Sequence, residues 1–377
     1  MIKKKLVEGL EFAGGECETY VILDDNGLPI FIPTQWLLSL ATMKGSPKTT
    51  LRTYASRITS FLNIVEKSIR ADKSKVTLSN ITDEEIQGFL LGHVIGTNQS
   101  KVSTYKNYHA ALVELYRWAN NTGLVEHKDI PLNLVGARNL SSTDAQSNLQ
   151  LLQTTYLTEK EFIDTILSNV QEEKSFEQER DELVLCLGYY AGFRTHENGN
   201  KKNLRVEELR EWLHKDIKAI SAKHLVIYGK GSEKPRTIPF IPKLLERIHK
   251  FLWGAAKDIK TGPLICSMGG KILAPEHGTR VFNAAKKGYL AYASLEKDDS
   301  SAWMKRTYHV LRKCYATNAT TQLISDGLSP WVWLPQWMGH EDPEITRDYV
   351  FFDAVLNNRL EVIESLSLSE QVSRHHD

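Results

Sequence analysis

YHVLRKCYATN (residues 308–318) and MGHEDPEITRDYVFF (residues 338–352) open and close the segment around which the chain is organised. Apolar residues recur at helical spacing in the first part, which predicts a helix there. His309 and Arg312 would share one face of that helix, because residues three apart on a helix are neighbours. His340 follows a glycine in the second part, and Tyr349 comes nine residues later.

These residue types suit an attack on a phosphodiester. The planar fork of an arginine matches phosphate oxygens, and histidine moves protons near neutral pH. A tyrosine can become the covalent intermediate. Each of them alone is more often a solvated or core residue, so the prediction of phosphoryl transfer depends on their order and spacing.

The order H-x-L-R-x-x-aromatic-A-T at 309–317, then Gly-His at 339–340, then a tyrosine nine residues on, resembles the C-terminal signature of the tyrosine recombinase (phage integrase) family. The resemblance implies a mainly α fold with a small β-sheet. It implies a helical core-binding domain at the N-terminus and a mixed α/β catalytic domain at the C-terminus.

Composition narrows the class of protein without naming a partner. The 377 residues suffice for two or three domains, and 41% hydrophobic with 25% charged residues is typical of a globular protein. The net charge of +1 does not indicate a polyanion binder. Four well-separated cysteines indicate neither a disulfide framework nor a zinc site. With no apolar run long enough to span a bilayer and no signal peptide, we expect a cytoplasmic protein.

Composition shifts divide the chain into four segments. Residues 1–45 are expected to form a β-hairpin appendage, with TYVILDDNGLPIFIP (19–33) as two strands around Asp-Asn-Gly. Residues 46–130 show three amphipathic helical patterns and are similar to the family's DNA-binding core-binding domain. The polar segment 131–155 is expected to be a linker. Residues 156–377 are expected to be the catalytic domain.

YYAGFRTHE (189–197) follows a buried helical pattern and resembles the family's first-arginine motif. On that interpretation Arg194 faces the phosphate and Glu197 holds its guanidinium. Arg205, in LRVEEL, fits the looser pattern, and its spacing to the downstream lysine is nearer the usual one. We favour Arg194 because it follows a long apolar helix and a glycine, and the alternative stays open.

Two β-rich runs, residues 224–228 and 237–240, flank GKGSEKPR and predict a hairpin with Lys230 at its bend. A Gly-Lys-Gly turn is ordinarily just a turn, but here it resembles the family's hairpin lysine. Bulky LSPWVWLPQW (328–337) is expected to be core and loop packing. Apolar positions over residues 352–368 predict a last helix. It packs either on its own domain or, as the resemblance implies, on a neighbouring protomer, and we favour the second.

The resemblance implies a reaction, a set of residues and partners. Tyr349 would form a 3′-phosphotyrosine without metal or other cofactor, and double-stranded DNA carrying a specific site would be the substrate. A homotetramer on two duplexes, accessory DNA-bending proteins, and a bacterial, nucleoid-associated location without membrane are implied, most simply for the integrase of a mobile element. A type IB topoisomerase and a chromosome-dimer resolvase are the alternatives. The residues that the resemblance makes catalytic are Arg194, Lys230, His309, Arg312, His340 and Tyr349.

Overall fold

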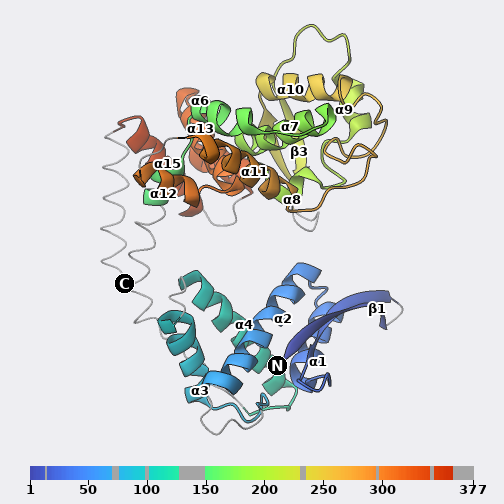
Figure 1. The fold of residues 1–377 in the computed structure, drawn as a ribbon, viewed down its shortest axis with the longest axis vertical. Coiled ribbons are helices and arrows are strands. Elements are labelled where there is room, and N and C mark those ends of the chain that lie inside the picture. The colour runs from blue at the N-terminus through green and yellow to red at the C-terminus, as the bar shows by residue number, and fades with distance from the viewer. Residues whose placement is uncertain are drawn as a thin grey trace. The chain divides into compact units, whose positions relative to one another are not determined.

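The computed structural model describes residues 1–12, 15–69, 76–97, 102–126, 149–229, 235–293, 297–339 and 344–359. The chain divides into two compact units, residues 1–144 and residues 145–377, and each has a hydrophobic core of its own. Within the described residues, both units are mainly helical and each holds one two-stranded sheet (Figure 1). The predicted fold class, mainly α with little β-structure, is confirmed. Over these same ranges, no helix has both the length and the apolar character needed to cross a membrane.

The first unit packs a β-hairpin and its helices around one core. Ile22 of the hairpin and Trp36, Leu62 and Leu112 of three helices are each at most 1% exposed. Each such side chain stabilises the unit by roughly 1.5–3 kcal/mol. The hairpin therefore belongs to the same core as the helices that follow it. The elements of this unit are β1 (Lys3–Phe12), β2 (Gly15–Leu23), α1 (Phe31–Thr42), α2 (Lys48–Ile64) continuing as a π-helix (Val65–Ile69), α3 (Asp83–Gln87) continuing as a π-helix (Gly88–Thr97), and α4 (Val102–Asn121).

The N-terminal hairpin is paired differently from the prediction, which placed its turn at residues 25–27. β1 and β2 pair with each other as an antiparallel ladder, so the whole hairpin precedes that sequence. Asp24 instead stabilises a local turn, because its Oδ1 accepts the backbone N–H groups of Asn26 (2.9 Å) and Leu28 (2.8 Å). The chain then enters α1, whose first turn contains Pro33, a position where proline is tolerated in a helix.

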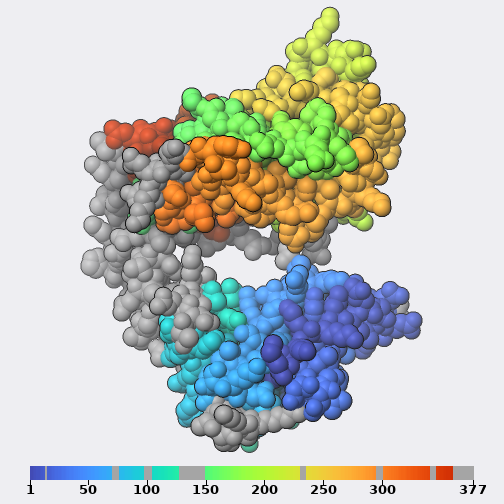
Figure 2. Space-filling view, in the orientation of Figure 1, coloured from blue at the N-terminus to red at the C-terminus, as the bar shows by residue number. Residues whose placement is uncertain are grey.

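The second unit is built around α7, which contacts α10, α11, α13 and β4. Figure 1 shows α7 in the middle of this unit. Figure 2 shows the surface of the same unit, on which the segments are closely packed. Residues 149–155 are helical as well. The other elements are α6 (Glu159–Glu161) with its continuations Phe162–Ile166 and Leu167–Asn169, α7 (Ser175–Ala191), α8 (Thr195–Asn198), α9 (Val206–Trp212), β3 (Lys223–Tyr228), β4 (Pro235–Phe240), α10 (Pro242–Trp253), α11 (His277–Tyr292), α12 (Lys297–Lys305), α13 (Tyr308–Ser325), α14 (Pro330–Met338) and α15 (Glu344–Leu356).

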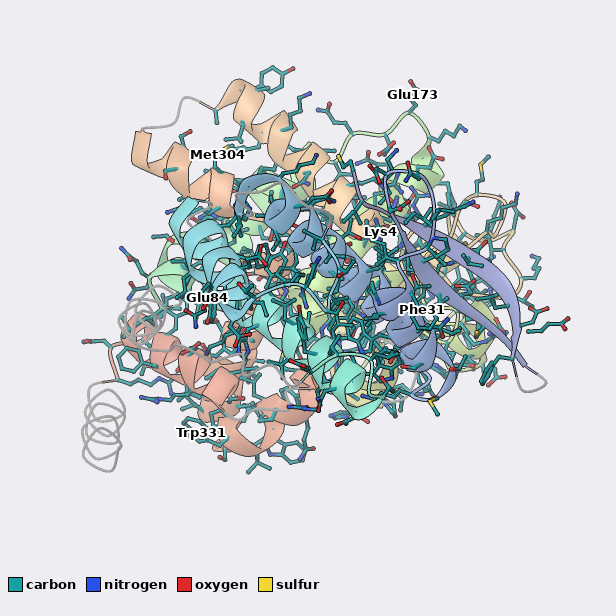
Figure 3. The ribbon with its side chains drawn as sticks, turned by 90° about the horizontal axis from the view of Figure 1, so that it is seen from below. Lys4, Phe31, Glu84, Glu173, Met304 and Trp331 are labelled. Carbon is teal, nitrogen blue, oxygen red and sulfur yellow. The ribbon has the colours of Figure 1, made fainter. Side chains whose placement is uncertain are left out.

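Residues 330–338 form a helix rather than the predicted core and loop packing. Pro330 occupies the first position of α14, where its missing N–H costs nothing. Leu334 and Met338, one turn apart, are fully buried, whereas Trp331 is 44% and Val332 53% exposed. Trp331 lies at the outside of the molecule in Figure 3. The helical period therefore turns half of this aromatic run away from the core.

Candidate active site

The first turn of α13 is fixed against α7 by a buried tyrosine. The hydroxyl of Tyr308 donates to the carbonyl oxygen of Val184 (3.0 Å) and accepts from Nδ2 of Asn198 (2.9 Å). Gly188 allows this approach, because a Cβ there would lie 2.9 Å from that hydroxyl. The position of the next residue, His309, is therefore set by contacts with two other helices.

Arg312, one turn further along α13, is held by backbone carbonyls. Its Nη1 donates to the carbonyl oxygen of Gly192 and its Nη2 to that of Met338, and the residue is 2% exposed. Burial, together with the nearby cations Arg194 and Arg236, lowers the pKa of this guanidinium to about 9. It is still charged at neutral pH, and it has more N–H groups than the two carbonyls use.

Arg194 reaches the same region through the turn that ends α7. Gly192 adopts the left-handed conformation (φ +62°), and a Cβ there would lie 2.5 Å from Cδ1 of Tyr315. Glu197 then accepts the backbone N–H of Arg194 (2.7 Å) and its Nη1 (3.0 Å). The side chain of Arg194 is 35% exposed, so its remaining donors are open to a ligand. This agrees with the role that the sequence motif predicted for Glu197.

Glu197 has a second cationic partner, which the sequence reasoning missed. It is fully buried, and Arg236 of β4 donates to both of its oxygens, at 2.7 Å for Oε2. Burial alone disfavours the charged carboxylate, but the hydrogen bonds from Arg236 and from the backbone of Arg194 outweigh it and lower the pKa of Glu197. Arg236 also donates to the carbonyl oxygen of Gly192, at 3.5 Å.

Arg205, the alternative candidate for the first catalytic arginine, has different neighbours. Arg205 precedes α9, where it pairs with Glu207 and donates to the carbonyl oxygen of Lys201 (3.2 Å). Arg194, by contrast, is close enough to lower the pKa of Arg312 by charge repulsion. Both arginines pair with a carboxylate, but only Arg194 is grouped with Arg312. Assignment of the catalytic role to Arg194 stays a prediction, and this grouping favours it.

His309 and Tyr349 line one pocket of about 210 Å³. Burial raises the pKa of the Tyr349 phenol to about 12, although Arg312 acts in the opposite direction. His309 is an exposed residue, but protein atoms crowd its imidazole. This desolvation and the cations Lys313, Arg312 and Arg194 lower its pKa to about 4. At neutral pH a neutral imidazole therefore shares a pocket with a protonated phenol, which are the protonation states from which a general base starts. The pocket is lined by Leu152, His309, Lys313, Ile345, Asp348 and Tyr349.

Asp353, one turn beyond Tyr349, ties α15 to α13. Its Oδ1 accepts from Oγ1 of Thr321 on α13 and from Nδ2 of Asn357 (2.7 Å). Arg359 lies 3.4 Å from its other oxygen, and Asp353 is fully buried. The carboxylate therefore links the helix that carries the phenol to α13.

Lys230 and His340, two of the predicted catalytic residues, lie outside the described residues. The structure does describe the residues that precede each of them. Asn203 fixes the end of β3, since it accepts the backbone N–H of Tyr228 (2.8 Å) and donates to its carbonyl oxygen (3.1 Å). Gly339 ends α14 in the left-handed conformation (φ +61°), one residue before His340. Their roles remain predictions.

Comparisons with known proteins bear on the family and the fold. Residues 34–124 match the family model described as the phage integrase N-terminal SAM-like domain. The structure is similar to that of the XerH site-specific recombinase bound to palindromic difH substrate in a post-cleavage complex, with a TM-score of 0.53 and 18% identity over 90% of this chain and 85% of that chain. It is also similar to lambda integrase (75–356) as a dimer bound to a COC′ core site, with a TM-score of 0.48 and 18% identity over 84% of this chain and 94% of the other. No curated protein sequence matches the chain significantly.

Within the first unit, residues 34–124 thus match a phage-integrase SAM-like domain, and the fold is similar to that of XerH. The predicted resemblance to the tyrosine recombinase (phage integrase) family is therefore confirmed.

Proposed function

We propose that the chain is a site-specific DNA recombinase that cuts and rejoins duplex DNA through a 3′-phosphotyrosine on Tyr349. The observation that carries the proposal is the electrostatic grouping of Arg194, Arg312 and His309, with Tyr349 in the same pocket as His309. The likeness of the fold to XerH, whose structure is a post-cleavage complex with its DNA substrate, supports it.

The reaction is a phosphoryl transfer in two symmetrical steps. The phenolic oxygen of Tyr349 attacks the scissile phosphorus in line, and the bond from phosphorus to the 5′-oxygen breaks. His309 accepts the phenolic proton, while Lys230 gives a proton to the departing 5′-oxygen. A 5′-hydroxyl of a partner strand then attacks the phosphotyrosine and the protons return. His340 donates a hydrogen bond to the phosphate during both steps.

The two arginines supply the electrostatic part of catalysis. Negative charge grows on the non-bridging phosphate oxygens, and preorganised donors aimed at such oxygens are usually the largest single contribution. Arg312 is held by two carbonyls, and the side chain of Arg194 is 35% exposed. Guanidinium groups in these positions do the work that divalent metals do in other phosphoryl-transfer enzymes. We therefore propose chemistry without metal or ATP.

The biological setting that we propose follows the same reasoning. The first unit would bind the DNA site, residues 156–377 would carry the chemistry, and a homotetramer would hold two duplexes, with accessory DNA-bending proteins, in a bacterial cytoplasm. The match of residues 34–124 to phage integrases favours the integrase of a mobile element over a type IB topoisomerase. A chromosome-dimer resolvase is the second candidate, which the likeness to XerH favours.

The proposal is tested with DNA that the protein itself selects. Duplexes recovered from a random-sequence pool by binding are rebuilt with a nick, so that the short 5′-hydroxyl product diffuses away. We expect a covalent protein–DNA adduct to accumulate in EDTA with the native chain and none with Tyr349→Phe. Cleavage that needed a divalent metal, or that survived this substitution, would refute the mechanism. Relaxation of supercoiled plasmid without strand exchange would identify the topoisomerase alternative.

A further inference from the structure

Arg236 is a buried cation that the proposed mechanism does not use. Its side chain is 4% exposed, and it lies on the inward face of β4 with Ile238 and Phe240. Both of its Nη atoms are engaged, with the two oxygens of Glu197 and with the carbonyl oxygen of Gly192. These contacts are with groups that also hold Arg194 and Arg312, which points to a role that acts through its partners.

The same partners, Glu197 and Gly192, also form hydrogen bonds with the two arginines of the candidate site. Glu197 also accepts the backbone N–H and Nη1 of Arg194. The carbonyl oxygen of Gly192 also accepts Nη1 of Arg312. Arg236 is thus hydrogen-bonded to the anchor of each arginine, although it lies far from both in sequence.

The charges explain why this link matters. Arg194, Arg236 and Arg312 surround a single buried carboxylate, Glu197, so the cluster carries excess positive charge. An arginine and a carboxylate prefer a bidentate pairing, and here Arg236 occupies both oxygens of Glu197. Arg194 is left with one side-chain bond to that carboxylate. Without Arg236, Glu197 would draw the guanidinium of Arg194 into the bidentate pairing and away from Arg312 and His309, which it lies close enough to influence.

We propose that Arg236 is a positioning residue that occupies and neutralises Glu197, so that Arg194 keeps its guanidinium for the scissile phosphate. This inference rests on the proposed function. A purely structural ion pair between β4 and α8 would affect all substrates alike. The positioning role predicts instead that loss of Arg236 slows the reaction only where the scissile phosphate carries its negative charge. β4 also directly follows the predicted Lys230 turn, so the same contact anchors that hairpin to the arginine cluster.

The test compares Arg236→Met with a matched control, Arg180→Met. Arg180 is equally buried, at 6% exposed, and pairs with Asp181 (2.7 Å) near the start of α7, away from the cluster. Adduct formation is measured in single turnover on the selected nicked duplex. One substrate has an ordinary scissile phosphate, and the other has a methylphosphonate, which lacks the negative charge that the arginines neutralise.

On the phosphate substrate we expect Arg236→Met to lower the rate about 10- to 100-fold, the scale expected when a catalytic group is displaced by about 1 Å. On the methylphosphonate substrate, the loss of rate in Arg236→Met should be no larger than the loss in Arg180→Met. Equal losses on both substrates, or the same loss in both variants, would overturn the inference. If Arg236→Met does not fold, Arg236→Lys keeps the charge without the fork and should show the same dependence on the substrate. Failure of the unmodified chain to form any adduct would instead overturn the proposed function.

Discussion

Replacement of Gly192 by alanine tests the turn on which both arginines depend. An alanine in the left-handed conformation (φ +62°) costs about 1–2 kcal/mol. Its Cβ would also lie 2.5 Å from Cδ1 and 3.0 Å from Cε1 of Tyr315. Relief of such overpacking typically costs about 1–3 kcal/mol. We therefore expect Gly192→Ala to lower the free energy of unfolding by about 2–5 kcal/mol. The carbonyl of Gly192 holds Arg312, so adduct formation should fall by about 100-fold.

Gly327→Ala is the matched control for that substitution. Gly327 has φ +69°, and a Cβ there would meet nothing within 4 Å. The free energy of unfolding of Gly327→Ala should fall only by the conformational cost of about 1–2 kcal/mol. Its activity should be unchanged. Urea unfolding followed by circular dichroism measures the first quantity, and single-turnover adduct formation measures the second. Equal stability of the two variants would show that the contact between Gly192 and Tyr315 does not constrain the turn.

Three further substitutions or conditions probe the site. Asp353→Ala removes the buried carboxylate that accepts from Thr321 and Asn357, and hydrogen bonds to a charged group are worth about 1–3 kcal/mol, so stability should fall by that amount and the rate with it; an unchanged melting temperature would contradict this. Asn203→Ala removes the bonds that fix the end of β3, and a loss of about 1–3 kcal/mol is expected by urea titration; a loss within experimental error would refute that anchor. The lowered pKa of His309 keeps it neutral in the free protein, so the adduct rate at subsaturating DNA should hold as pH falls from about 8 to 5.5. A fall in the adduct rate with a midpoint near pH 6.5, the ordinary pKa of histidine, would contradict a lowered pKa of His309.

The features that local sequence determines were predictable. The pattern Thr-x-x-Glu forms the capping boxes Thr82–Glu85 and Thr158–Glu161, in which both partners lie within one turn. The hairpin of β3 and β4 and the helix α13 also follow from periodicity and turn residues over short distances. Lys230 and His340 carry equally clear motifs, and their roles stay predictions.

Features set by long-range packing were harder to predict. The pairing of β1 with β2 is one, because Asp-Asn-Gly at residues 25–27 is the stronger local hairpin signal. The pair between Arg236 and Glu197 joins residues 39 apart, and no local rule predicts it. A signal did exist: the alternation R-T-I-P-F places Arg236 on the apolar face of its strand, where a charge needs a buried partner. Asp353 likewise stands within the apolar run FFDAVL.

The central claim is that one phenol becomes esterified to a DNA 3′ end. Its most direct test is mass spectrometry of the protease-digested adduct, formed in EDTA on the selected nicked duplex and trimmed with nuclease. We predict a single modified peptide, with a nucleoside 3′-phosphate on the oxygen of Tyr349. A nucleotide attached to any other residue, or an adduct in which the phosphate remains on the 5′ end, would contradict the account.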